Sequence, residues 1–405
     1  MSRCHIAKSI ARGTVCAPPS KSYAHRLLMA AFLSAKRTRI GKIDLSDDIL
    51  STIGCIEALG ASTQIDGRSV TVTPGTGSSV VPLECRQSGS TLRFMIPLAL
   101  AKSGKGYFTG SAKLFSRGIG EYEKIFTRQD IKYALCGDSL SVEGVLKSGT
   151  FTIDGSTSSQ YITGLLFALP LLEGDSKIVI IPPVQSRPYI DITLDVLRMS
   201  GVEAHFEKNE ISIPGNQRYA LPDCTVEGDW SNAAFLDIYN HLGGSVTVTG
   251  LNPQSLQGDR AYRELFDRLE TGYSTIDIGN CIDLGPVLFS LAAVKHGARF
   301  TNTARLRIKE SDRVSDLLTE LAKIGVSAIV EDNAVEIKPI SDVRLAALQG
   351  NDIVFSSHND HRIAMSLAAL ASLFGATIDG SEAVGKSYPG FWEDIKNLNI
   401  DICNG

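Results

Sequence analysis

Basic side chains stand where several apolar segments of the sequence begin. Each segment is long enough for a buried helix, and the openings contain Lys21 and Arg26 in the first segment, Arg93 in the second and Arg362 in the last. Lysine and arginine are rarely buried in a helix unless they have partners. The free amide groups and the dipole at a helix start also favour anions. Serine and aspartate in these openings are good helix caps, but four cations favour a binding site for a substrate with several acidic groups.

Acidic and basic residues also lie close together in two short segments, RIKESDR at residues 307–313 and NDHR at residues 359–362. The first has a structural interpretation as a solvated turn capped by Ser311, and the second as a capped helix with a buried His361. Asp283 falls in the first turn of another apolar segment, where a carboxylate is favourable on electrostatic grounds alone. These patterns leave both a structural and a catalytic interpretation open.

The apolar segments recur along the chain, with starts at residues 20, 88, 158, 229, 281 and 358. Between them, amphipathic segments end near glycine and strand-like alternation follows, as in SDRVSDLLTELAKIG before AVEIKP. A repeat of this length predicts an α/β fold of six similar units, arranged as two domains of three units each. Turn-forming residues at 215–229 place the change of domain near residues 226–229.

Composition and motif searches exclude several classes of protein. The chain has 405 residues and a net charge of −4, which argues against general nucleic-acid binding. Its apolar stretches are far shorter than the ~20 residues needed to span a bilayer. The sequence lacks a P-loop, a G-x-G-x-x-G motif that opens a βαβ unit, H-E-x-x-H and G-x-S-x-G. Its 8 cysteines show no C-x-x-C spacing, so we expect free thiols in a reducing cytoplasm and no zinc site.

A set of short motifs occurs in a fixed order along most of the chain: PPSKSYAHR, QSGSTLR, SRGIG, DGSTSSQYITGLL, SRPYIDITL, RIKESDR, NDHR and GKSYPGF. Together they resemble the 5-enolpyruvylshikimate-3-phosphate synthase family of enolpyruvyl transferases, also called 3-phosphoshikimate 1-carboxyvinyltransferases. The resemblance extends from residue 18 to residue 391. Each motif alone is a weak signal, whereas the ordered set is specific.

The resemblance implies transfer of the enolpyruvyl group of phosphoenolpyruvate to the 5-hydroxyl of shikimate 3-phosphate, with release of phosphate. This addition–elimination through a tetrahedral intermediate belongs to the shikimate pathway, which leads to chorismate and the aromatic amino acids. The family fold consists of βαβαββ-type units, three in each domain, with the active site in the interdomain cleft. Its N-terminal strand joins the second half, which implies one domain at residues 1–17 plus 229–405 and one at residues 18–228. We further expect a cytoplasmic monomer that needs no metal or cofactor and has no nucleic-acid or membrane partner.

By similarity, most of the motif residues would bind one of the two substrates. The residues expected at shikimate 3-phosphate are Lys21, Ser22, Arg26, Ser158, Ser159, Gln160, Ser186, Tyr189, Asp283, Arg305 and Lys309. Those expected at phosphoenolpyruvate are Lys21, Gly89, Arg93, Arg117, Gln160, Arg313, Arg362 and Lys386. Asp283 would take the proton of the 5-hydroxyl, and either Lys21 or Glu310 would move the proton at C3. Arg305 stands where many relatives have asparagine, and Ser90 replaces a common threonine.

Two other functions remain as alternatives. A related transferase acts on a UDP-amino sugar and uses a cysteine on a mobile loop, but the corresponding segment, residues 112–124, contains no cysteine. A non-catalytic phosphate-binding regulator of the same fold would need only the cations, and Asp283 and Glu310 beside them favour an enzyme. An RNA-end-processing relative is disfavoured by the acidic net charge.

Overall fold

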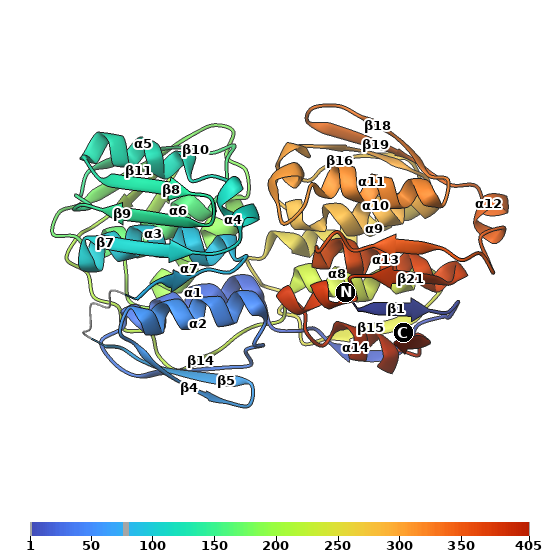
Figure 1. Ribbon diagram of the computed structural model, residues 1–405, viewed down its shortest axis with the longest axis horizontal. Helices are drawn as coiled ribbons and strands as arrows, with labels where there is room; N and C mark the ends of the chain where they lie inside the picture. Colours follow the sequence, from blue (N-terminus) through green and yellow to red (C-terminus); the bar gives the residue numbers. More distant parts are fainter. Residues whose placement is uncertain (1, 76–80, 405) are drawn as a thin grey trace. The chain divides into compact units, whose positions relative to one another are not determined.

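The computed structural model describes residues 2–75 and 81–404. The chain forms two compact units (Figure 1). One is Pro19–Glu227, here called the middle unit, and the other is Met1–Pro18 with Gly228–Gly405, here called the terminal unit. The chain therefore passes from one unit to the other between residues 18 and 19 and between residues 227 and 228. Each of these points is one residue from the expected boundary.

The middle unit contains seven α-helices and twelve strands among its described residues. The helices are α1 (Lys21–Leu33), α2 (Asp47–Ala58), α3 (Gly89–Ser103), α4 (Ala112–Ser116), α5 (Gly120–Gln129), α6 (Gln160–Ala168) and α7 (Arg187–Met199), and the short 3-10 helix η1 (Leu169–Leu171) follows α6. The strands are β3 (Thr38–Gly41), β4 (Ser62–Asp66), β5 (Ser69–Thr73), β6 (Leu83–Glu84), β7 (Lys105–Thr109), β8 (Lys132–Cys136), β9 (Ser139–Glu143), β10 (Thr150–Asp154), β11 (Ser176–Ile181), β12 (His205–Glu207), β13 (Glu210–Ile213) and β14 (Cys224–Thr225).

The terminal unit repeats this mixture of helices and short strands. Its helices are α8 (Trp230–His241), α9 (Tyr262–Thr271), α10 (Gly285–Val294), α11 (Arg313–Lys323), α12 (Asp342–Ala346), α13 (His361–Phe374) and α14 (Phe391–Asn397), with 3-10 helices η2 (Gly258–Ala261), η3 (Ile282–Leu284), η4 (Ala304–Ile308) and η5 (Ser381–Lys386). Its strands are β1 (Arg3–Ile6), β2 (Arg12–Cys16), β15 (Ser245–Thr249), β16 (Ser274–Asp277), β17 (Ala298–Thr301), β18 (Ser327–Val330), β19 (Ala334–Lys338), β20 (Val354–Ser356), β21 (Ala376–Asp379) and β22 (Ile402–Asn404).

The sheets show the repeat most directly. The described residues form five four-stranded sheets, in the orders β14-β3-β5-β4, β6-β7-β9-β8, β10-β11-β13-β12, β16-β17-β19-β18 and β20-β21-β1-β22. In each of them the first pair of strands is parallel and the other two pairs are antiparallel. A two-stranded parallel sheet of β15 and β2 is the sixth. The predicted α/β fold of repeated units is therefore confirmed.

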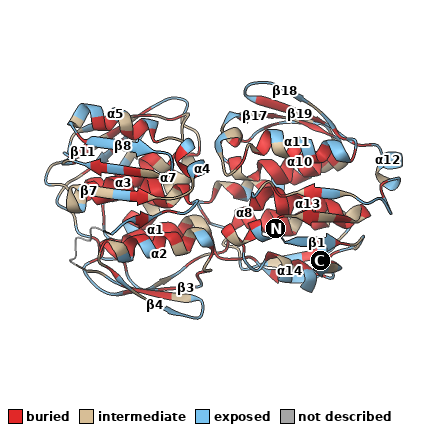
Figure 2. Ribbon diagram, viewed as in Figure 1, coloured by how far each residue is buried: buried red, intermediate tan, exposed pale blue. Residues whose placement is uncertain are grey.

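The six apolar segments of the sequence form the buried helices α1, α3, α6, α8, α10 and α13, as predicted. In α13 nearly every side chain is buried, and Figure 2 shows the same for α10. Each unit has its own hydrophobic core, because the buried residues of the middle unit form one cluster and those of the terminal unit another. Burial of so much apolar area is the main contribution to the stability of each unit.

Two local predictions in the terminal unit were wrong. Ser311 does not cap α11; the cap is Asp312, whose carboxylate accepts hydrogen bonds from the amides of Val314 and Ser315. Asp283 lies in the 3-10 helix η3 directly before α10, not in the first turn of the α-helix. The physical reason is that Pro286 sits near the start of α10, where its missing amide hydrogen and fixed φ favour a helix start.

Helices α3 and α6 pack closely because α6 carries a glycine at the contact. A Cβ atom on Gly164 would overlap the carbonyl oxygen of Arg93 and the hydroxyl oxygen of Tyr122. The Tyr122 hydroxyl donates to that same carbonyl at 2.6 Å. The close approach therefore holds the segment of α3 that carries Arg93 against α5 and α6.

This packing predicts opposite effects for two glycine substitutions in the middle unit. Gly164→Ala should lower the free energy of unfolding by about 1–3 kcal/mol, because the added methyl overpacks the core. Gly54→Ala is the matched control: Gly54 lies exposed within α2, and an added Cβ meets no atom within 4 Å. It should raise the free energy of unfolding by about 0.5–1 kcal/mol. Urea unfolding of the two variants measures both, and a neutral Gly164→Ala would contradict the close helix contact.

Candidate active site

In the middle unit, the first cations of the sequence lie at the start of α1. Ser20 caps this helix, and Lys21 is its first residue. The Lys21 ammonium lies 2.9 Å from the Asp48 carboxylate on α2. One turn later, the buried Arg26 guanidinium donates to Thr193, to Thr163 and to two backbone carbonyl oxygens. These acceptors are neutral oxygens, and burial lowers the pKa of Arg26 to about 10.

A second cationic cluster surrounds the start of α3. The buried Arg93 guanidinium donates to the side-chain oxygen of Gln160 at 3.1 Å and to the carbonyl of Gly118 at 3.0 Å. The Gln160 amide in turn donates to the Ser90 hydroxyl at 2.9 Å. A Cβ atom on Gly89 would lie 2.9 Å from a guanidinium nitrogen of Arg93 and 2.9 Å from one of Arg117. Two guanidinium groups thus converge on one glycine, an arrangement that suits an anionic ligand.

Hydroxyl groups connect the two clusters. The His25 ring lies 2.7 Å from the Thr52 hydroxyl, which is 2.8 Å from the Thr91 hydroxyl, and Thr91 donates to Ser88 at 2.7 Å. Ser88 caps α3. Burial, and next the charges of Lys21 and Arg26, lower the pKa of His25 well below its usual range. A neutral His25 therefore ties α1, α2 and the start of α3 together without adding charge.

The predicted phosphate-binding serines lie at the starts of α6 and α7. Ser159 occupies the N-cap position of α6, and the Ser158 hydroxyl accepts from the amide of Gln160 at 3.3 Å. Ser186 occupies the N-cap position of α7 with a φ of 56°, in the left-handed region that non-glycine residues seldom occupy. Such conformations cluster at functional sites, where the surrounding structure holds them. Tyr189 follows on α7, and its carbonyl accepts from Arg26 at 3.0 Å.

In the terminal unit, one carboxylate gathers three cations. Asp283 lies 3.0 Å from Arg313, 3.4 Å from Lys309 and 3.4 Å from Arg362. Each cation comes from a different part of the chain: Lys309 follows η4, Arg313 is the first residue of α11, and Arg362 lies at the start of α13. Burial lowers the pKa of Lys309, and the charge of Asp283 opposes that effect.

Arg313 is the most enclosed of these cations, with 1% of its side chain exposed. It also contacts Asp360 at 2.7 Å and Glu310 at 2.6 Å. Burial alone would lower the pKa of Arg313, but the charges of Asp360, Glu310 and Asp283 outweigh it and raise the pKa. Three carboxylates thus hold one buried guanidinium in a fixed orientation.

Two remaining predicted residues lie near this group. Lys386, on η5, donates to the carbonyl of Asn359, within the NDHR segment. Arg305, on η4, donates to the carbonyl of Gly279 at 2.6 Å and is close enough for its charge to affect Lys309. His361 is buried within the core of the unit, as expected for a structural histidine.

The predicted site residues therefore divide into two groups, one in each unit. The middle unit contains Lys21, Ser22, Arg26, Gly89, Arg93, Arg117, Ser158, Ser159, Gln160, Ser186 and Tyr189, and the terminal unit contains Asp283, Arg305, Lys309, Glu310, Arg313, Arg362 and Lys386. Sequence reasoning missed Asp48 and Asp360 as the partners of Lys21 and Arg313. The NDHR motif was a signal for Asp360, whereas nothing local marks Asp48.

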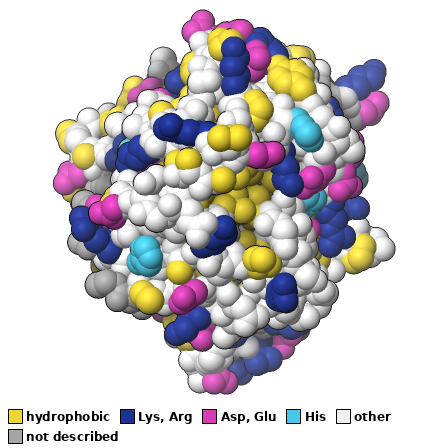
Figure 3. Space-filling model, turned by 90° about the vertical axis from the view of Figure 1, so that its right-hand side faces the viewer, with side chains coloured by type: hydrophobic (Ala, Val, Ile, Leu, Met, Phe, Trp, Pro, Cys, Tyr) yellow, Lys and Arg dark blue, Asp and Glu magenta, His cyan; other side chains and the backbone are white. Residues whose placement is uncertain are grey.

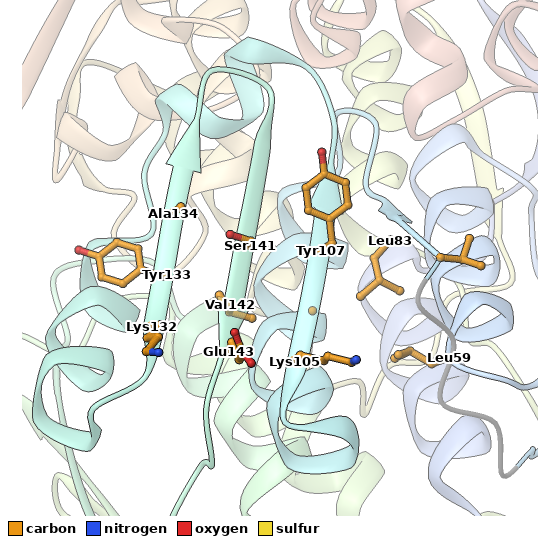
Figure 4. Close-up of a pocket in the computed structure, with 12 residues that line it drawn as sticks. Leu59, Leu83, Lys105, Tyr107, Lys132, Tyr133, Ala134, Ser141, Val142 and Glu143 are labelled. Atoms are coloured by element: carbon orange, nitrogen blue, oxygen red, sulfur yellow. The ribbon is translucent and has the colours of Figure 1, made fainter.

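A separate pocket of about 500 Å³ lies against strands β7, β8 and β9 (Figure 4). Its walls include Leu59, Leu83, Lys105, Tyr107 and Lys132, and it contains none of the predicted site residues. It is therefore not the candidate site. Among the described residues, no group of three or more His, Cys, Asp or Glu side chains is placed to hold a metal ion.

The fold of the chain is that of the enolpyruvyl transferases. EPSP synthase from Acinetobacter baumannii superimposes with a TM-score of 0.79 over 100% of both chains, at 22% sequence identity. The enolpyruvyl transferase NikO from Streptomyces tendae superimposes with a TM-score of 0.78 over 100% of this chain and 98% of its own, at 16% identity.

Sequence comparison gives the family. The family model for EPSP synthase (3-phosphoshikimate 1-carboxyvinyltransferase) matches residues 7–395. The 3-phosphoshikimate 1-carboxyvinyltransferase of Clostridium kluyveri is 41% identical over 96% of both chains, and that of Clostridium perfringens is 37% identical over 98% of both. The chain belongs to the EPSP synthase family. The resemblance inferred from the ordered motifs is confirmed.

The buried Arg313 cluster generates a stability prediction. Asp360→Asn should lower the free energy of unfolding by about 3 kcal/mol, because it leaves part of a buried positive charge without its partner. The matched control is Asp379→Asn, which removes the Asp379 contact with Arg3, a side chain that is 63% exposed. That loss should stay within about 1 kcal/mol. Urea unfolding compares the two, and equal losses would contradict the account of Arg313 as a buried, carboxylate-held cation.

Proposed function

We propose that the cations of the two groups bind the phosphates and carboxylates of one pair of substrates, phosphoenolpyruvate and shikimate 3-phosphate. As a member of its family, the chain transfers the enolpyruvyl group from the first to the 5-hydroxyl of the second and releases phosphate. This is a step of the shikimate pathway to chorismate and the aromatic amino acids. The main support for this proposal is that three cations contact Asp283. Groups that can bind anions therefore lie next to a carboxylate that can accept a proton.

In this proposal the phosphate of shikimate 3-phosphate binds to serine hydroxyl groups, to helix starts and to Arg26. The serines are Ser158, Ser159 and Ser186, at the starts of α6 and α7. Helix starts offer amide groups and a favourable dipole to a phosphate. The Arg26 acceptors are neutral oxygens, so its charge remains available to an anion. The remaining contacts of this substrate come from Lys21, Ser22, Gln160, Tyr189, Asp283, Arg305 and Lys309.

Phosphoenolpyruvate brings a phosphate and a carboxylate close together, so it requires several cations at once. Arg93 and Arg117, which flank Gly89, form one part of its binding site in this proposal. Arg313 and Arg362 form another, since both guanidinium groups lie near Asp283. Lys21, Gln160 and Lys386 complete the set. Arginine is suited to this task because its planar fork can bind an oxyanion through two hydrogen bonds.

Asp283 acts as the general base. Its carboxylate contacts Lys309, Arg313 and Arg362. In this proposal the incoming phosphates and carboxylates draw on the same cations and leave the Asp283 carboxylate free to contact the 5-hydroxyl. It then takes the proton of the 5-hydroxyl as that oxygen forms a bond to C2 of phosphoenolpyruvate.

A second group must give a proton to C3 in the addition step. Breakage of the bond between C2 and the phosphate oxygen then releases phosphate, and C3 returns a proton. Lys21 and Glu310 are the two candidates. The Lys21 ammonium, which contacts Asp48, has protons that it can donate. The Glu310 carboxylate, which contacts Arg313, has oxygen atoms that can accept the returning proton.

The enzyme is proposed to act in the cytoplasm as a monomer, on small molecules alone. Within the described residues, no helix is long and apolar enough to cross a membrane. The net charge of −4 is unlike that of a nucleic-acid-binding protein, and Figure 3 shows basic and acidic side chains interspersed over the face that it displays.

The role of Asp283 predicts a specific loss of turnover. Asp283→Asn should lower kcat by about 10²–10⁴, because an amide keeps the shape but cannot act as a base. The KM values should change much less. The measurement is the release of phosphate from phosphoenolpyruvate in the presence of shikimate 3-phosphate. No phosphate should be released when a UDP-amino sugar replaces shikimate 3-phosphate. The matched control is Asp267→Asn, at an exposed position of α9. Near-normal turnover of Asp283→Asn would place the base elsewhere.

Gly89 predicts a loss in binding without a loss in stability. The three atoms nearest to the methyl of Gly89→Ala would be guanidinium nitrogens of Arg93 and Arg117, at the ends of side chains that can move away. The variant should therefore unfold within about 1 kcal/mol of the original protein. Its KM for phosphoenolpyruvate should rise about tenfold, since two guanidinium groups leave their positions. If kinetic titration showed an unchanged KM, the two arginines would not form part of that site.

A further inference from the structure

Three elements of the terminal unit bring a buried carboxyl group, a hydroxyl and a guanidinium into one chain of contacts. Asp259 lies on η2, Ser231 in the first turn of α8 and Arg362 at the start of α13, and each side chain is almost fully buried. The Arg362 guanidinium donates from Nη1 to the Ser231 hydroxyl at 2.7 Å. The Ser231 hydroxyl also lowers the pKa of the neighbouring Asp259 carboxyl group, through a side-chain hydrogen bond.

The chemistry of the three groups fixes the direction of these hydrogen bonds. A guanidinium can only donate, so the Ser231 oxygen must accept from Arg362. The single hydrogen of the hydroxyl is then available for Asp259. Burial, and next the charge of Asp283, raise the pKa of Asp259 to about 7. Whether ionised or protonated, the carboxyl group keeps an oxygen that can accept from Ser231.

The surroundings hold this chain of contacts in place. The side chain of Gln257, just before η2, accepts from the amide of Trp230 at 3.0 Å and donates to the carbonyl of Gly228 at 2.8 Å. These bonds join η2 to the start of α8, and so hold together the two segments that carry Asp259 and Ser231. On its other side, Arg362 Nη1 donates to the carbonyl of Asp283 at 3.0 Å.

We propose that Ser231 and Asp259 are positioning residues for phosphoenolpyruvate: Asp259 orients the Ser231 hydroxyl, and Ser231 holds the Arg362 guanidinium in its binding orientation. The inference rests on the proposed role of Arg362 at that substrate. Without Ser231, Arg362 would lose an acceptor and could turn towards the Asp283 carboxylate, which already lies 3.4 Å from Nη2. The Asp283 carboxylate would then neutralise part of the positive charge of Arg362 before phosphoenolpyruvate binds.

Kinetics of two Ser231 variants test the inference. Ser231→Ala should raise the KM for phosphoenolpyruvate about tenfold, the usual effect of losing a hydrogen bond to a charged group. The KM for shikimate 3-phosphate should change less than about twofold, because Arg362 is not among its ligands. Ser231→Thr retains the hydroxyl and should restore most of the affinity. The control is Ser290→Ala on α10, which removes another buried hydroxyl of the same unit and should leave both KM values unchanged.

A double-mutant cycle tests the order of action. Asp259→Ala should act through Ser231, so adding it to Ser231→Ala should weaken phosphoenolpyruvate binding little further. Additive effects on the KM would overturn the relay from Asp259 to Ser231, because independent sites add. If Asp259→Ala does not fold, the Ser231 variants alone test the role of Ser231. Asp259→Asn then replaces Asp259→Ala in the cycle. It should change the KM for phosphoenolpyruvate less than threefold, because its amide oxygen can still accept a hydrogen bond from Ser231.

Arg362→Lys separates the failure of this inference from that of the proposed function. If Arg362→Lys raises the KM for phosphoenolpyruvate and Ser231→Ala does not, Ser231 is not a positioning residue, while the role of Arg362 stands. If Arg362→Lys leaves that KM unchanged, the proposed role of Arg362 fails and the inference fails with it. Equal rises for both substrates, accompanied by a lower melting temperature, would reveal a merely structural role and overturn the inference.

Discussion

Buried cations need oxygen atoms around them, and this requirement shapes both groups of site residues. The cost of removing a charged group from water is several kcal/mol even after the protein relaxes. The two units satisfy this requirement for oxygen atoms differently. In the terminal unit, carboxylates surround the cations: Asp283, Glu310 and Asp360 all contact Arg313. In the middle unit, hydroxyl, amide and carbonyl oxygens take that role at Arg26 and Arg93. The first arrangement supplies groups that move protons, and the second leaves positive charge available to anions.

The repeated fold explains how so many charged groups reach the starts of helices. Each repeat places one apolar helix in the interior, and the first turn of such a helix is the part that must meet polar partners. Lys21, Arg93 and Arg362 occupy the first one or two turns of α1, α3 and α13. The apolar remainder of each helix fixes these turns within a core, so the cations are held by packing as well as by their hydrogen bonds. The repeat that buries the apolar helices therefore also positions the cations of the candidate active site.

The sequence predicted the helices and the cations well, because both leave local patterns. Mostly apolar segments of helical length marked the six buried helices, and charged residues within these segments were recognisable as candidates for the site. The pairs that orient those cations leave no local pattern. Asp48 and Lys21 are 27 residues apart, Asp360 and Arg313 are 47 apart, and Ser231 and Arg362 are 131 apart. Only the fold brings them together. The substrate assigned to each residue came from the family resemblance and not from the residues themselves.

We propose that two groups of cations, one in each unit, bind a single pair of substrates with Asp283 at the reacting hydroxyl. A crystal structure of Asp283→Asn with phosphoenolpyruvate and shikimate 3-phosphate bound would show the position of both substrates. We expect the phosphate of shikimate 3-phosphate to contact Ser158, Ser159 and Ser186, and phosphoenolpyruvate to contact arginines of both groups. We also expect the side chain at position 283 to lie within hydrogen-bond distance of the 5-hydroxyl. Substrates held by one group alone, or a 5-hydroxyl out of reach of position 283, would contradict this proposal.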